Sequence, residues 1–70
     1  MAESVYKFIE IAGSSTESWE KAAVAAVETA ARSLNDLRVA EVLEQDMTIE
    51  KGKVSAYRIK LKVSFKYRTD

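Results

Sequence analysis

Charged side chains of opposite sign follow two segments in the second half of the sequence, and their spacing makes them the first candidates for chemistry. Glu44 and Asp46 are two positions apart, and Arg58 and Lys60 repeat that spacing. Side chains two positions apart lie on one face of a β-strand. Two interpretations stay open for these four groups. They form cross-strand ion pairs, or some of them line a ligand or ion site in an assembled particle.

The composition excludes several kinds of chemistry. The chain has 70 residues, no His, no Cys and no Pro, which rules out a zinc finger, a disulfide scaffold and a Ser–His or Cys–His catalytic pair. Acid–base catalysis would lack a histidine, and no residue near the paired carboxylates is marked as a nucleophile. Eleven basic and eleven acidic residues give zero net charge, so the electrostatic footprint of a nucleic-acid-binding protein is absent. We therefore predict a protein that is not an enzyme and does not bind nucleic acid.

The first half of the chain predicts a strand followed by a helix. Residues 5–11 are rich in β-branched and aromatic side chains and end at Ala12-Gly13. A capping box of Ser14 and Glu17 then predicts a helix over residues 16–34, which is rich in alanine and has one apolar stripe. Trp19 lies on that stripe, which favours core packing over a role as a stacking platform for a ligand.

The second half predicts a long hairpin. Residues 37–49 and 53–67 read as two strands around a turn at residues 50–52, where Gly52 supplies a positive φ. Folding the hairpin there places Asp46 near Arg58 and Glu44 near Lys60, give or take one two-residue slip. The predicted fold class is α+β, with the order β-α-β-β in one domain spanning residues 1–70.

The lengths of these elements predict an oligomer. A fifteen-residue strand spans about 50 Å, whereas a nineteen-residue helix covers about 28 Å, so one helix leaves much of the hairpin's apolar row uncovered. A chain of this size without disulfides is also marginally stable alone.

The sequence shows no apolar run long enough for a membrane span and no basic leader, and we expect a cytoplasmic protein.

The whole chain resembles the dodecin family. The resemblance rests on residues 5–15 (VYKFIEIAGSS), the junction at residues 34–38 (LNDLR), the Glu41-Val42 step and residues 62–65 (KVSF). It implies a hollow homododecamer in which three-stranded antiparallel sheets wrap around short helices.

Dodecins are known as flavin-binding particles, and the resemblance implies a flavin site formed by a stacking Trp on the second strand and a Gln on the third. This sequence has Val39 at the Trp position and Arg58 at the Gln position. An isopropyl group offers no stacking surface, so we predict against flavin binding of the usual kind. A flavin dodecin with an altered site, or a scaffold whose only activity is assembly, is the alternative.

The sequence is more similar to the calcium dodecin branch, over residues 37–47 (LRVAEVLEQDM) and 57–66 (YRIKLKVSFK). That resemblance implies a small-ligand or ion storage particle with calcium as the favoured ion. Calcium takes six to eight oxygen ligands, and Glu44 and Asp46 are the side chains whose chemistry suits it. Backbone carbonyls, waters and symmetry-related subunits would complete the shell.

Overall fold

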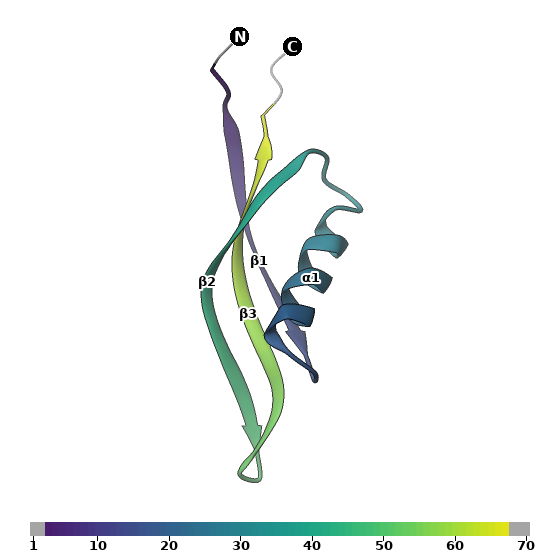
Figure 1. Ribbon diagram of the computed structural model, residues 1–70, viewed down its shortest axis with the longest axis vertical. Helices are drawn as coiled ribbons and strands as arrows, with labels where there is room; N and C mark the ends of the chain where they lie inside the picture. Colours follow the sequence, from purple (N-terminus) through teal and green to yellow (C-terminus); the bar gives the residue numbers. More distant parts are fainter. Residues whose placement is uncertain (1–2, 68–70) are drawn as a thin grey trace.

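The computed structural model describes residues 3–67 and contains four elements (Figure 1). Strand β1 spans Tyr6–Ser15, helix α1 Trp19–Ala30, strand β2 Leu37–Glu50 and strand β3 Lys53–Lys66. The predicted β-α-β-β order is confirmed. The two hairpin strands end within one residue of their predicted ends, and β1 runs four residues further than predicted.

The sheet is antiparallel and its last strand lies in the middle, in the order β1-β3-β2. Tyr6 pairs with Lys66 at one end of β1, and Ser15 pairs with Tyr57 at the other. The hairpin between β2 and β3 closes on the pair Glu50–Lys53. Its two turn residues, Lys51 and Gly52, have φ of 52° and 76°, as a two-residue turn that matches the strand twist requires. The predicted role of Gly52 is confirmed.

The core forms where α1 packs on β1 and β3. Ile59, Leu61 and Val63 alternate along β3 and are buried beneath the helix together with Ala22. The small helix residues allow a close approach, because a Cβ added to Gly13 would lie 2.5 Å from the carbonyl oxygen of Ala22. A side chain at position 13 would therefore push the helix off the sheet.

The helix is shorter than the predicted range of residues 16–34, and the predicted capping box does not form. Ser14 continues β1, and the N-cap is Ser18, whose hydroxyl accepts a hydrogen bond from the Lys21 amide at 3.0 Å. The Ser15 hydroxyl accepts from the Glu17 amide at 2.9 Å in the turn before it. The hydroxyls of Ser14, Ser15 and Ser18 can each accept a hydrogen bond from a backbone amide. Because β1 extends through Ser15, Ser14 is part of the strand and does not cap the helix.

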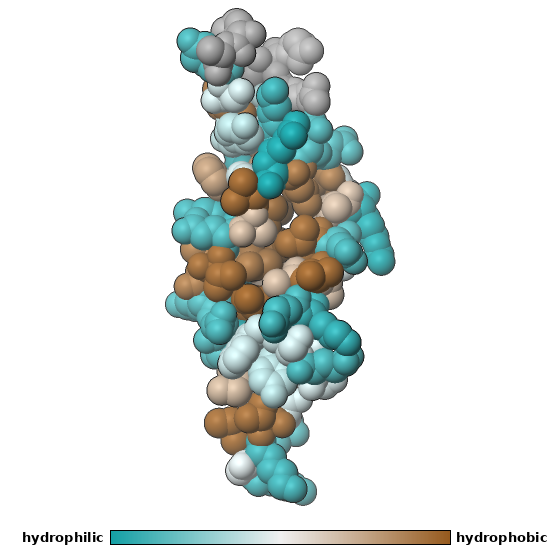
Figure 2. All heavy atoms as spheres, in the orientation of Figure 1, coloured by the Kyte–Doolittle hydropathy of each residue, from teal (hydrophilic) through white to brown (hydrophobic). Residues whose placement is uncertain are grey.

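Large apolar surfaces stay exposed, because the helix of about 18 Å covers part of a protomer 54 Å long. It packs on β1 and β3 and leaves β2 largely uncovered, so Val42, beside Leu61, is 51% exposed. Beyond Ser15 the hairpin is two-stranded, and its Ile49–Val54 pair is exposed. Figure 2 shows apolar side chains at mid-height and a smaller group near the hairpin end.

Among residues 3–67, no helix is long and apolar enough to cross a membrane.

Candidate functional site

A charged hollow lies on the face of the sheet opposite the helix, which we call the open face. The side chains of β3 alternate, so Arg58 and Lys60 point away from the buried Ile59 and Leu61. The hollow has a volume of about 440 Å³ and runs across all three strands. Small residues of β1 border it on one side and acidic residues of β2 on the other. Its lining comprises Ala12, Gly13, Ser14, Glu44, Asp46, Arg58, Ile59 and Lys60.

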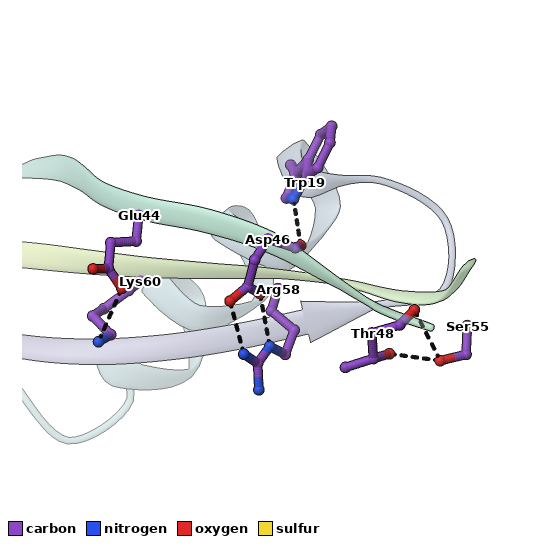
Figure 3. A network of polar contacts seen from close by, with 7 residues as sticks. All are labelled: Trp19, Glu44, Asp46, Thr48, Ser55, Arg58 and Lys60. Atoms are coloured by element: carbon purple, nitrogen blue, oxygen red, sulfur yellow. Dashed lines mark hydrogen bonds and ion pairs between the residues drawn. The ribbon is translucent and has the colours of Figure 1, made fainter. Parts of the chain in front are cut away.

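Two cross-strand ion pairs occupy the acidic side of the hollow (Figure 3). Arg58 donates to Asp46 twice, from Nε to Oδ1 and from Nη2 to Oδ2, both at 2.7 Å. Lys60 Nζ lies 3.2 Å from Glu44 Oε1. Both pairs join the residues that were predicted to face each other, and a one-residue register shift between Thr48 and Ile49 separates them from the turn. In the protomer, the four charged groups that were the first candidates for chemistry therefore neutralise one another.

The electrostatics of the Asp46–Arg58 pair follow from its two-point geometry. The hydrogen bonds from Arg58 stabilise the ionised carboxylate and lower the pKa of Asp46 below its ordinary value of 3.8, against a smaller opposing effect of desolvation. The same contacts raise the pKa of Arg58. Both groups are thus charged throughout the neutral range.

The Asp46–Arg58 pair leads us to expect that the protein loses stability in acid. Because the folded-state pKa of Asp46 is lowered, its contribution is present above the unfolded pKa and is lost as the pH falls through the folded value. We expect the melting temperature to fall as the pH drops below about 4, and the fall to be shallower in Asp46→Asn. Thermal unfolding from pH 7 to pH 2 measures it. Equal slopes for the two proteins would contradict a role for Asp46.

A hydrogen bond that the sequence did not predict connects the hollow to the helix. The indole Nε1 of Trp19 donates to the backbone carbonyl of Asp46 at 2.9 Å, and its ring meets that of Tyr57 edge-on at 5.1 Å between centroids. Trp19 packs against the core, as predicted. It reaches β2 from the helix side, while the Asp46 side chain lies on the open face (Figure 3). The acceptor is a backbone oxygen, which has no signature in the sequence.

Val39 and Arg58, the two positions at which the resemblance implied a flavin site, share the open face but lie far apart in the protomer. Val39 pairs with Ser64, six positions from Arg58 along β3, which corresponds to about 20 Å. Val39 is 63% exposed, and its backbone oxygen accepts a hydrogen bond from the Ser64 hydroxyl at 3.4 Å. A ligand that touches both side chains at once would have to be large or to lie between protomers.

Glu44 and Asp46 do not form a calcium site by themselves within one protomer. Each carboxylate is engaged by a basic side chain, and calcium needs six to eight oxygen ligands. Within the described range, no group of three or more acidic side chains is placed to hold a metal ion. The two carboxylates alone therefore supply too few oxygen atoms for this ion.

Comparison with known proteins places the chain in a family. The family model "Dodecin" matches residues 5–68, and the chain belongs to the dodecin family. The calcium dodecin of Mycobacterium tuberculosis is 55% identical over 65 residues, which are 93% of this chain and 92% of that protein.

Solved structures show the same fold. A crystal structure of calcium dodecin from Mycobacterium tuberculosis, described as having a novel calcium-binding site, is 56% identical, covers 96% of each chain and gives a TM-score of 0.81. The dodecin of Streptomyces coelicolor is 28% identical, covers all of both chains and gives a TM-score of 0.91. The predicted resemblance to the dodecins, including the calcium dodecin branch, is confirmed.

Proposed function

We propose that this protein is a non-enzymatic calcium-binding particle of the cytoplasm, assembled as a homododecamer from protomers spanning residues 1–70. The observation that carries the proposal is the 55% identity to calcium dodecin over almost the whole of both chains. The absence of His and Cys supports it, because oxygen atoms are then the main ligands that the side chains offer to a metal ion.

The uncovered apolar face of β2 supports the assembly. Val42 and Met47 are 51% and 43% exposed on the helix side of the sheet, which α1 covers only in part. Exposed apolar patches of this kind mark protein–protein interfaces. A second copy of the chain supplies the cover that the short helix does not.

Assembly also supplies what the calcium site lacks. Glu44 and Asp46 remain the predicted side-chain ligands, and carboxylates or carbonyls from neighbouring protomers would raise the number of oxygen atoms toward that required. Calcium would then compete with Lys60 and Arg58 for these carboxylates. Both ion pairs are half exposed to solvent, so their partners can exchange without opening the core.

Flavin binding is not favoured by the geometry. The Val39 side chain offers no aromatic surface, and Arg58 lies about 20 Å from it along the sheet. The guanidinium of Arg58 is also held by Asp46.

Calorimetric titration of chelator-treated protein with calcium tests the proposal. We expect saturable heat, and a stabilisation of about 2.7 kcal/mol per site when free calcium reaches 100 times its Kd. The double variant Glu44→Gln/Asp46→Asn is expected to lose at least tenfold in affinity. Glu41→Gln serves as the control, because Glu41 lies on the same strand and face but pairs with Lys62 outside the hollow.

Two results would contradict separate parts of this proposal. Native protein that gives neither heat nor a change in melting temperature with calcium is not a calcium-binding particle. A double variant that binds as tightly as the native protein shows that Glu44 and Asp46 are not the ligands, and leaves calcium binding itself intact.

A further inference from the structure

The two sides of the charged hollow differ in a way that the ion pairs alone do not explain. On the β2 side, Arg58 and Lys60 face carboxylates. On the β1 side they are paired with Ser14 and Ala12, which are small, uncharged and exposed. The hollow of about 440 Å³ thus opens beside two cations and over side chains that leave room for a ligand.

Asp46 binds Arg58 in the manner of an oxyanion ligand. It accepts from Nε and Nη2, both at 2.7 Å, and these are the two parallel donors with which an arginine holds a carboxylate or phosphate. Lys60 lies two residues from Arg58 along β3, on the same face, and makes a single, longer contact of 3.2 Å with Glu44. Asp46 therefore holds the stronger of the two pairs and occupies the donors that an incoming oxyanion would need.

We propose that Asp46 is an internal counter-ion that closes an oxyanion-binding site formed by Arg58, Lys60 and Ser14. With Asp46 ionised, the four charges of the hollow sum to zero. An added anion then finds Nε and Nη2 of Arg58 already occupied by a carboxylate. Without that charge, the Arg58 guanidinium and the Lys60 ammonium present an unbalanced positive charge beside the Ser14 hydroxyl. Asp46 is in this sense a specificity-determining residue that selects against phosphate-bearing ligands. The inference does not depend on calcium binding.

Titration with inorganic pyrophosphate, in calcium-free buffer of constant ionic strength, tests this inference. We expect Asp46→Asn to bind pyrophosphate at least tenfold more tightly than the native protein. Asp46→Ala is measured beside it, because an asparagine can still accept a hydrogen bond from Arg58 and alanine cannot. Asp46 is 52% exposed, and melting temperature and mass of each variant check that it folds and assembles as the native protein does.

Two controls separate release of Arg58 from a general change of charge. Glu41→Gln removes the same charge from the same face outside the hollow and should leave pyrophosphate affinity unchanged. Adding Arg58→Gln to Asp46→Ala should abolish the gain. The inference is wrong if both Asp46 variants bind no more tightly than Glu41→Gln, or if the gain persists without Arg58. Neither result depends on the outcome of the calcium titration.

Discussion

Replacing Leu61 by alanine is expected to lower the free energy of unfolding by about 2–5 kcal/mol. Leu61 is 1% exposed and stands between Ile59 and Val63 in the buried row of β3, where the helix crosses the central strand. The row is short, and a large part of the stability of a chain of this size depends on it. Loss of the leucine side chain leaves a cavity that the neighbouring strands cannot easily fill.

Denaturant unfolding at a fixed protomer concentration measures this effect. Leu43→Ala is the matched control, because it deletes the same atoms from a side chain that is 37% exposed at a bulge of β2. The difference between the two variants isolates the burial inside the protomer. A loss below about 1 kcal/mol for Leu61→Ala would show that the core lies elsewhere.

Replacing Val42 by aspartate is expected to abolish assembly while leaving the protomer fold intact. Val42 lies beside Leu61 on the helix side of the sheet but is 51% exposed, so a charge there meets water in a single protomer. In an assembly that covers this face the same charge is buried without a partner, at a cost of several kcal/mol per subunit. That cost is repeated at every copy of the interface.

Native mass spectrometry and circular dichroism together measure the outcome. We expect native protein at a multiple of the 7.8 kDa chain mass, and Val42→Asp as smaller species with unchanged secondary structure. Glu41→Gln, one residue away on the opposite face, should assemble normally. Native protein that runs as a monomer, or a Val42→Asp variant of native mass, would contradict the assembly that we propose.

The hairpin could be predicted closely because the turn and the alternation of side chains both restrict its register. The turn at Lys51-Gly52 fixes the closing pair Glu50–Lys53, and the alternation of charged and apolar residues along β3 fixes which face each side chain takes. A slip of one residue would bury Lys60 in place of Leu61. Counted from the closing pair Glu50–Lys53, Asp46 would face Tyr57, and the one-residue register shift between Thr48 and Ile49 brings it opposite Arg58.

The helix ends and the ligand set were less accessible to sequence reasoning. Ser14, Ser15 and Ser18 are chemically equivalent as caps, and only the extension of β1 to Ser15 decides among them. The hydrogen bond from Trp19 ends on a backbone carbonyl, which every residue has. Calcium ligands contributed by carbonyls or by neighbouring protomers leave no residue pattern in one chain for the same reason.

The position of β3 has a consequence for how the chain acquires its structure during synthesis. β1 and β2 share no border in the sheet, since each pairs with β3. Among residues 3–67, β3 also carries three of the four buried core residues. As the chain leaves the ribosome, neither strand has its partner until the last element has emerged. The pairing of β1 with β3 is long-range, and pairing of this kind is slow and leaves unpaired edges open to aggregation. The nascent chain therefore completes its three-stranded sheet and its core only after β3 has emerged.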